Sequence, residues 1–204
     1  AVLNLHKKVF NDFDIKDYWY RLSLPDFKNK EKFGDVKNKK NWETGAAILK
    51  KSLKNLGHKF TETIGEASFY GPKIDIQMKD LYGKEDTIAT SQIDILVPKR
   101  MGLTYIDREG KEKYPLVIHR AILGAYERFI AFLLEQTAGN LPLWLSPVQV
   151  KILTINDAVG SYAKSVAAEL HKNFRTEVDE RNESIGKKIR EAEMQKIPYL
   201  LIIG

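Results

Sequence analysis

The first sixty residues carry apolar side chains at helical spacing, then at strand spacing, then at helical spacing again. Residues 3–13 repeat apolar positions every three to four residues and predict a helix, although no capping residue precedes it. Residues 17–24 alternate bulky apolar and polar side chains, which predicts a short strand. The lysine-rich stretch 25–40 is typical of a solvated loop, and residues 42–56 predict a second helix that Gly57 ends.

Residues 58–118 have the short-period pattern of antiparallel strands. Residues 73–79 alternate strictly, which predicts one buried face and one face that is wet or functional. Residues 87–97 predict the next strand, residues 107–110 a hairpin turn, and residues 114–118 a short apolar strand.

The pattern changes again in the last third of the chain, after Gly124 opens a predicted helix. The elements predicted there are a strand at 148–155, a helix at 158–174, a strand at 176–179, a helix at 184–195 and a strand at 199–203. Strands that are apolar throughout indicate a parallel or mixed sheet covered by helices. We therefore expect one domain over residues 1–144 and a second over residues 145–204.

Composition narrows the class of protein only slightly. The chain is 43% hydrophobic and 29% charged, which is ordinary for a globular protein. No apolar run approaches the roughly 18 residues of a membrane span, and the start lacks a signal-peptide pattern, so we expect a cytoplasmic protein. Cysteine is absent, which excludes disulfides and thiolate metal sites. The net charge of +6 suits a nucleic-acid partner, although a solvated basic surface explains it equally well.

Polar side chains interrupt the predicted strands where a half-buried sheet would favour apolar ones. Asp75 and Gln77 share a strand face with Lys73, and Gln92 and Asp94 share one with Thr90. Such a face is either exposed to solvent or the floor of a ligand site. Because antiparallel sheets often face water on one side, the pattern by itself favours exposure.

Two segments point more directly to chemistry. In residues 65–73, a Gly-Pro step holds Tyr70 close to Lys73, and a phenol beside a fixed ammonium can orient a carboxylate or a phosphate. In residues 119–129, a strand passes through a glycine into a helix, and Arg128 in its first turns suits a phosphate. Taken singly, a packed tyrosine in a turn and a core histidine at 119 remain the more ordinary interpretations.

One known motif and four further stretches, in order along the chain, give these segments a common interpretation. Residues 124–129, Gly-Ala-Tyr-Glu-Arg-Phe, are similar to motif 3 of the class II aminoacyl-tRNA synthetases. Together with residues 65–75, 91–94, 118–124 and 143–150, they resemble the threonyl-tRNA synthetase family, over essentially the whole chain but weakly before residue 60. The resemblance implies part of an α+β class II catalytic core built on an antiparallel sheet. Part of an α/β anticodon-binding domain with a mixed sheet is expected to follow it.

The resemblance also implies a role for each residue of the active site. Tyr70 matches the tyrosine that contacts the amino group of threonine, and Gln92 matches a glutamine of the active-site sheet. Lys73 matches a catalytic lysine near the reacting carboxylate, and Arg128 matches the catalytic arginine that binds the phosphates of ATP beside Gly124. The implied reaction is attack of the threonine carboxylate on the α-phosphate of ATP, aided by Mg²⁺, and transfer of threonine to tRNA.

Metal and tRNA ligands follow from the same resemblance. The family holds zinc with one cysteine and two histidines, and His119 matches one of the histidines. Since the other ligands precede this region in the family, we expect zinc in the full-length enzyme but no complete site in this chain. Asn182 matches an asparagine that contacts the anticodon, and Lys196 stands where an arginine is common. The implied partners are threonine, ATP, tRNA(Thr) and, for the full-length enzyme, a second copy.

The chain departs from the family in several places. Motifs 1 and 2 are not found in residues 1–60, and the last strand leaves the anticodon domain incomplete. Thr87 and Ala125 replace a glutamine and a serine that lie near ATP in the family. We therefore expect a fragment that is inactive by itself. The alternatives are a non-catalytic paralogue that binds tRNA or a partner protein, and, within the class, prolyl or glycyl specificity.

Overall fold

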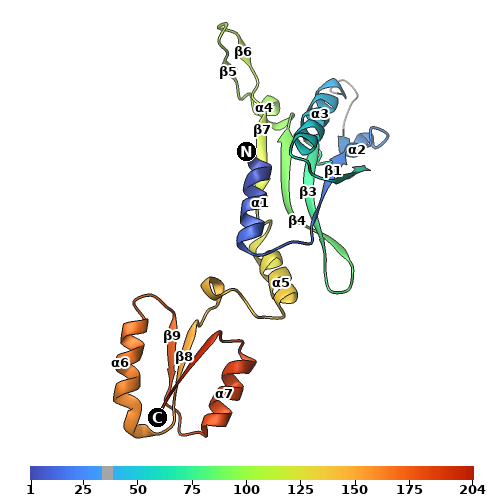
Figure 1. Ribbon diagram of the computed structural model, residues 1–204. Helices are drawn as coiled ribbons and strands as arrows, with labels where there is room; N and C mark the ends of the chain where they lie inside the picture. The colour runs from blue at the N-terminus through green and yellow to red at the C-terminus, as the bar shows by residue number, and fades with distance from the viewer. Residues whose placement is uncertain (34–38) are drawn as a thin grey trace. The chain divides into compact units, whose positions relative to one another are not determined.

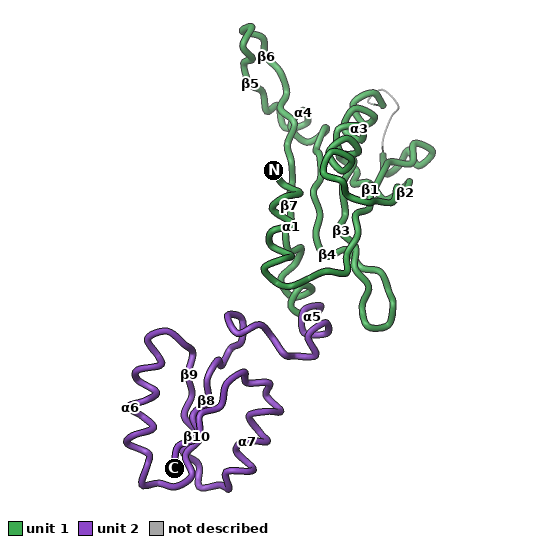
Figure 2. Tube along the Cα trace, in the orientation of Figure 1, with its two compact units in different colours: residues 1–130 green, residues 131–204 purple. Residues whose placement is uncertain are grey.

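The computed structural model describes residues 1–33 and 39–204. These residues form two compact units, residues 1–130 and residues 131–204, shown in Figure 2. The division between the units falls inside helix α5 (Tyr126–Thr137). Each unit has its own main β-sheet.

The first unit is built on a five-stranded sheet with the strand order β2-β1-β3-β4-β7. Its strands are β1 (Trp19–Leu24), β2 (Phe60–Ile64), β3 (Lys73–Lys79), β4 (Glu85–Asp94) and β7 (Val117–Ala121). Strand β3 pairs antiparallel with β1 and β4, and β4 pairs antiparallel with β7. The antiparallel character expected for residues 58–118 is therefore confirmed for β3, β4 and β7.

Strand β2 is the exception, because it pairs parallel with β1, from Tyr20 opposite Phe60 to Leu24 opposite Ile64. The prediction that all of residues 58–118 are antiparallel is wrong here. Helix α3 (Lys39–Asn55) lies between β1 and β2 in the chain and contacts β1 and β3. A helical crossover of this kind returns the chain in the direction of the first strand, which makes the next pairing parallel.

Helices α1 (Val2–Asp12) and α3 cover the same face of this sheet, as Figure 1 shows. Both helices bury a stripe of side chains at spacings of three and four residues, as an amphipathic helix does. The buried residues are Leu3, His6 and Phe10 of α1 and Trp42, Gly45, Leu49 and Leu53 of α3. Opposite them, Ser91 of β4 lies with its hydroxyl 3.0 Å from Nε2 of His6.

The lysine-rich stretch is less irregular than its composition predicts. Of the solvated loop expected at 25–40, residues 30–33 form the short helix α2 (Lys30–Phe33), and α3 already begins at Lys39. Residues 34–38 lie outside the described residues. The helix expected at 42–56 is confirmed, and Gly57 ends it with a left-handed φ of 68°.

Two strand ends differ from the sequence prediction. Strand β4 stops at Asp94 rather than at residue 97, because Oδ1 of Asp94 accepts hydrogen bonds from the amides of Leu96 and Val97, where helix α4 (Val97–Arg100) begins. After α4, the hairpin of β5 (Tyr105–Ile106) and β6 (Glu112–Lys113) confirms the predicted turn. The apolar strand expected at 114–118 was placed too early, since a proline at 115 cannot donate to a strand ladder.

The second unit contains a three-stranded parallel sheet with the order β10-β8-β9, as the apolar strands predicted. Its elements are η2 (Leu143–Leu145), β8 (Val150–Thr154), η3 (Asp157–Val159), α6 (Gly160–Leu170), β9 (Thr176–Asp179), α7 (Ile185–Met194) and β10 (Tyr199–Ile203). Helix α6 connects β8 to its neighbour β9, and α7 connects β9 back past β8 to β10 on the other edge. Right-handed crossovers therefore place the two helices on opposite faces, consistent with Figure 1.

Across residues 1–33 and 39–204, no helix has both the length and the apolar character that crossing a membrane requires.

Candidate functional site

The face of the first sheet that is turned away from α1 and α3 carries three rows of paired residues. Successive residues of a strand point to opposite faces, so the neighbours of Ile74 and Ser91 in the chain point away from the helices. The rows contain Ser23, Lys73, Gln92 and His119, then Arg21, Asp75, Thr90 and Ala121, and then Trp19, Gln77 and Thr87. Most of these side chains are polar, and they include six of the residues predicted to form a site or a polar strand face: Lys73, Asp75, Gln77, Thr90, Gln92 and His119.

The acidic side chains of this face and one amide are buried, whereas its cations are partly exposed. Asp75, Gln77 and Asp94 are almost completely inaccessible to solvent. The interpretation of the face as solvent-exposed is therefore wrong. The alternative interpretation, a polar floor of a ligand site, agrees with this burial. Burying charged and amide groups is costly unless each one has partners, so the contacts between these residues decide what the face can do.

Tyr70, Gln92 and His119 form one contact cluster at the end of this face. The Tyr70 hydroxyl donates a hydrogen bond to Oε1 of Gln92, which also accepts one from Oγ of Ser68 at 2.9 Å. The rings of Tyr70 and His119 lie with their centroids 5.2 Å apart. Gln92 and His119 are directly opposite each other on β4 and β7. Three predicted site residues from three separate segments are thus brought together.

The loop that carries Tyr70 is fixed to the end of β4 by its backbone. The Tyr70 carbonyl accepts a hydrogen bond from the amide of Ile95 at 3.0 Å, and the Pro72 carbonyl accepts one from Ile93 at 3.1 Å. Between them, Gly71 passes so close that a Cβ atom would collide with the Ile93 carbonyl oxygen. The glycine of the Tyr-Gly-Pro-Lys turn is therefore needed for close packing against β4, and this packing holds Tyr70 beside Gln92 and His119.

His119 lies in the middle of β7 (Val117–Ala121), whereas the strand predicted at residues 114–118 ended just before it. It is half exposed, and its Nε2 lies 2.9 Å from Oδ2 of buried Asp94. A histidine held in this way keeps Nδ1 available to a ligand. The described residues contain no cluster of three histidine, aspartate or glutamate side chains, so they do not form a zinc site by themselves. His119 offers at most one ligand nitrogen.

Lys73 is held by the buried carboxylate of Asp75, two residues away on the same face. Oδ2 of Asp75 lies 2.8 Å from Nζ of Lys73, 3.2 Å from Nη2 of Arg21 and 2.7 Å from Oγ of Ser23. Its Oδ1 accepts a hydrogen bond from Thr90 at 3.1 Å. Gln92 in turn donates to Oγ1 of Thr90 at 3.2 Å, so a continuous hydrogen-bonded chain joins Lys73 to the tyrosine cluster.

The partners of Asp75 on β1 were missed from the sequence. Arg21 and Ser23 belong to no motif, and their strand precedes β3 by about fifty residues of chain. They reach the site only because β1 pairs with β3 in a register that sets Arg21 opposite Asp75 and Ser23 opposite Lys73. The alternation of residues 17–24 was the signal available, but it does not identify the partner strand.

Arg128 lies at the other end of the polar face. Its Nη1 donates to the carbonyl of Thr87 at 3.2 Å and lies 3.5 Å from Oδ1 of Asp86. The hydroxyl of Thr87 accepts a hydrogen bond from Gln77 at 2.5 Å, which ties this end to β3. Among the described residues, no hydrogen bond or ion pair joins Arg128 to Tyr70, Lys73 or the other predicted site residues. More than half of its side chain is exposed, so the guanidinium is accessible to a ligand.

Gly124 precedes α5 rather than opening it. The helix begins at Tyr126, and Gly124 has a left-handed φ of 61° that no helical residue adopts. A Cβ atom at this position would also collide with the carbonyl oxygen of Ile88 on β4. The glycine therefore lets the chain cross β4 at close range and places Arg128 in the first turn of α5.

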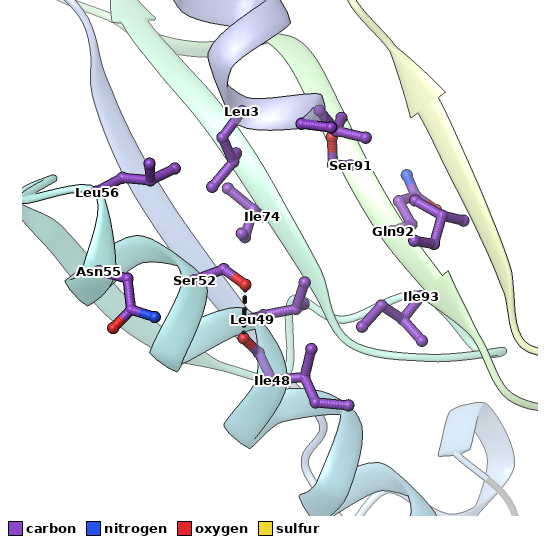
Figure 3. A pocket seen from close by; sticks show the side chains of 13 residues that line it. Leu3, Ile48, Leu49, Ser52, Asn55, Leu56, Ile74, Ser91, Gln92 and Ile93 are labelled. Atoms are coloured by element: carbon purple, nitrogen blue, oxygen red, sulfur yellow. Dashed lines mark hydrogen bonds between the residues drawn. The ribbon is translucent and has the colours of Figure 1, made fainter.

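A separate groove of about 340 Å³ lies on the helix-covered side of the sheet (Figure 3). Leu3, Leu49, Leu56 and Ile74 give it a mainly apolar lining, and Gln92 is the predicted site residue that borders it. Its chemistry differs from that of the polar face, which combines carboxylates, cations, amides and an imidazole. The polar face is the candidate site, since it can bind a charged ligand and orient it through several fixed donors.

In the second unit, the two predicted anticodon residues lie at opposite ends of the parallel sheet. Asn182 follows the carboxyl end of β9, and Lys196 precedes the amino end of β10. Helix α7, about 15 Å long, runs between them. Lys196 has a left-handed φ of 58°. The structure therefore does not bring these two side chains together.

The surroundings of Asn182 are strongly charged. The guanidinium of Arg181 donates to both carboxylate oxygens of Asp179 and lowers the pKa of that carboxyl. Nη2 of Arg181 also lies 2.7 Å from Oε2 of Glu191. Beneath them, buried Lys188 donates to the carbonyls of Thr154 and Asp179. These contacts fix the loop that carries Asn182 to the carboxyl ends of β8 and β9.

Comparison with protein families assigns both units. Residues 2–137 match the model of the tRNA synthetase class II core domain (G, H, P, S and T). Residues 149–204 match the model of the anticodon binding domain. The predicted fold class, a partial class II core followed by a partial anticodon-binding domain, is confirmed.

Individual relatives point to one branch of this class. Over 205 aligned residues, the chain is 48% identical to a threonine–tRNA ligase of Lactobacillus helveticus, and all of the chain matches 32% of that protein. Threonine–tRNA ligase 1 of Bacillus subtilis is 46% identical over 99% of the chain and 31% of its own length. The chain thus spans about a third of the length of these curated relatives.

Solved structures show the same similarity to threonyl-tRNA synthetases. The RNA binding domain of threonyl-tRNA synthetase from Cryptosporidium parvum superposes with a TM-score of 0.87 and 36% identity, over all of this chain and 50% of that one. Histidyl-tRNA synthetase from S. aureus, at 17% identity and a TM-score of 0.52, shares the fold over all of this chain and 54% of its own. The chain therefore belongs to the class II aminoacyl-tRNA synthetase family, and its sequence is similar to the threonine–tRNA ligases.

Proposed function

We propose that this chain is part of a longer threonine–tRNA ligase, which activates threonine with ATP and transfers it to the 3′ end of tRNA(Thr). The observation that carries the proposal is the contact cluster of Tyr70, Gln92 and His119, joined to Lys73 through buried hydrogen bonds. These four residues come from three motifs that resemble the threonyl enzymes. A scaffold without a substrate site gains nothing from gathering such groups on one buried face.

The polar face supports a division of roles for the amino acid. In this proposal Tyr70 and Gln92 bind threonine, with the Tyr70 hydroxyl near the amino group. The ammonium of Lys73 neutralises the carboxylate while that carboxylate attacks the α-phosphate. Since the four side chains are held by one another and by Asp75, they need little reorganisation when substrate binds, which is the condition for efficient positioning.

ATP is assigned to the other end of the face. Arg128 is accessible there, in the first turn of α5, where the helix dipole adds to its positive charge. Gly124 lets the chain lie against β4 just before α5, and we expect ATP to lie along this stretch, beside Gly124. Mg²⁺ would neutralise the phosphates during pyrophosphate release, as it commonly does in phosphoryl chemistry. Thr87 stands where the family has a glutamine. Its hydroxyl accepts a hydrogen bond from Gln77, and its carbonyl accepts one from Arg128.

Zinc, the anticodon contacts and the domain boundary are also proposals. His119 would supply one of three zinc ligands in the full-length enzyme, where zinc would favour a hydroxyl-bearing substrate. Asn182 and Lys196 would contact tRNA at two separate points rather than at one nucleotide. The boundary at residues 144 and 145 falls between the two family matches, which end at residue 137 and begin at residue 149. A homodimer in the cytoplasm is expected by analogy with the family.

The test is amino-acid-dependent ATP–pyrophosphate exchange by the full-length protein. We expect exchange with threonine and much less with valine, proline or glycine. In the Arg128→Ala variant, exchange should fall by about a hundredfold or more, because a phosphate contact is lost. No exchange with any amino acid, together with retained tRNA binding, would favour the non-catalytic alternative. Equal rates for the variant and the unaltered protein would remove Arg128 from its role.

A further inference from the structure

Arg21 of β1 brings a second cation to the polar face beside Lys73. Its Nη2 and the Nζ of Lys73 both contact one oxygen, Oδ2 of Asp75, at 3.2 Å and 2.8 Å. The register of β1 against β3 sets Arg21 directly opposite Asp75. No recognised motif contains Arg21, and the assignments proposed above give it no role.

Charge is unbalanced in this cluster. One buried carboxylate faces two cations, so the cluster carries a net positive charge before any ligand arrives. The next nearest acid is Glu66, whose Oε2 is 4.0 Å from Nη2 of Arg21. Its side chain is more than half exposed, so water screens that pair. Ser23 and Thr90 complete the hydrogen bonds of Asp75 without adding charge.

The cations and the carboxylate lie at different depths. The side chain of Asp75 is 0% exposed, whereas those of Lys73 and Arg21 are 18% and 20% exposed. A ligand that reaches this face therefore meets the two cations and not the carboxylate beneath them. An anion is favoured at such a point, and a cation is repelled.

Neutralising Asp75 does not by itself require both cations. One well-placed cation with hydroxyl donors satisfies a buried carboxylate, and a second charge taken out of water adds a desolvation cost. Nε of Arg21 is also buried without a hydrogen-bond partner among the described residues. A buried donor without a partner costs free energy, so the contacts within the fold do not by themselves account for an arginine at this position.

We propose that Arg21 is a substrate-binding residue, which acts with Lys73 on one anionic oxygen of the substrates. Asp75 is the positioning residue that holds both cations. The anion is either the carboxylate of the amino acid or a phosphate of the nucleotide, and the two give the same local chemistry. The inference rests on the proposed ligase function, and it adds a residue and a charge requirement to that site.

The test compares Arg21→Gln and Arg21→Lys with the unaltered full-length protein in ATP–pyrophosphate exchange, measuring kcat and both KM values. Arg108→Gln, a change in the exposed β5–β6 hairpin, is the matched control. We expect Arg21→Gln to lower kcat/KM by about ten- to a hundredfold, as for loss of a charged hydrogen bond. A rise in the KM for threonine identifies the carboxylate as the ligand, and a rise in the KM for ATP identifies the phosphate. Arg21→Lys should recover part of the loss.

Two results would overturn the inference. If both variants keep kcat and both KM values within about twofold, Arg21 serves only the fold, whatever happens to the melting temperature. If Arg21→Gln does not fold, the Arg21→Lys variant tests the substrate contact instead. Unchanged KM values in Arg21→Lys would then reject that contact. Absence of exchange in the unaltered protein would overturn the ligase proposal and this inference together, so the two failures are distinguishable.

Discussion

Nε2 of His119 lies 2.9 Å from Oδ2 of Asp94, while the other oxygen of Asp94 accepts hydrogen bonds from two amides at the start of α4. The carboxylate therefore orients the imidazole and ends the strand at the same time. Nε2–H donates to Asp94, which leaves Nδ1 of neutral His119 unprotonated and directed elsewhere.

Replacing Asp94 by Asn should switch the tautomer of His119. The amide oxygen of asparagine can keep the two backbone hydrogen bonds, which leaves its NH₂ group facing the ring. Nε2 must then accept a hydrogen bond from this NH₂ group, so the ring proton moves to Nδ1. Nitrogen-15 chemical shifts of the ring above pH 8 measure this directly. His171, in the other unit, should be unaffected, and an unchanged His119 signal would show that Asp94 does not set the tautomer.

His6 should make the first unit less stable in mild acid. Burial lowers its pKa to about 4, from an ordinary value of 6.5. Between these values the unfolded chain binds a proton that the folded chain does not. Stability is therefore full above pH 6.5 and falls as the pH drops toward 4, by about 3 kcal/mol at most.

Urea unfolding at intervals between pH 7 and pH 4 measures this loss. The variant His6→Asn removes the titrating group, so its stability should depend less on pH over the same range. An equal pH dependence in the two proteins would show that His6 is not the group responsible. His58, whose pKa burial also lowers, accounts for a smaller residual slope.

Gly124→Ala should destabilise the first unit more than Gly102→Ala does. Both glycines have left-handed φ angles, 61° and 64°, so alanine is strained at either position, at a cost of about 1 kcal/mol. Only at 124 does the added Cβ atom meet backbone, the carbonyl oxygen of Ile88, whereas at 102 it meets open space. We expect the difference in unfolding free energy to be about 1–3 kcal/mol. Equal losses in thermal unfolding would contradict the close approach of the chain to β4.

Lys188→Met should loosen the loop that carries Asn182. Lys188 is buried, and its ammonium donates to Thr154 and to the Asp179 carbonyl, so the variant leaves buried acceptors unpaired at a cost of roughly 2–4 kcal/mol. Lys187→Met is the control, because the Lys187 side chain is half exposed and its ammonium pairs with Glu183. Hydrogen–deuterium exchange of α7 should rise in the first variant and not in the second. Equal exchange in both would show that Lys188 does not hold α7 to the sheet.

Local patterns could be predicted from the sequence because they depend on neighbours in the chain. The strict alternation of residues 73–79 gave β3, and the apolar run at the end gave β10, both with the observed bounds. The parallel pairing of β1 and β2 could not be predicted in this way, since it depends on where α3 returns the chain.

In the candidate site too, residues within motifs could be predicted, and contacts that depend on strand pairing could not. Tyr70, Gln92 and His119 were predicted from motifs, and the structure brings them into contact. Arg21 was missed because its role arises from register across two strands, which alternation alone does not reveal. The polar face was interpreted as exposed because alternation does not distinguish water from a buried hydrogen-bond network.

The position of Lys73 provides the most direct test of the proposed site. Lys73 and Lys79 lie at the two ends of strand β3, but only Lys73 contacts Asp75 on the polar face, and Lys79 is exposed. The measurement is threonine-dependent ATP–pyrophosphate exchange by the full-length protein and its Lys73→Met and Lys79→Met variants. The account predicts that Lys73→Met lowers kcat/KM for threonine by about a hundredfold or more, while Lys79→Met stays within about twofold. Equal rates in the two variants would contradict it.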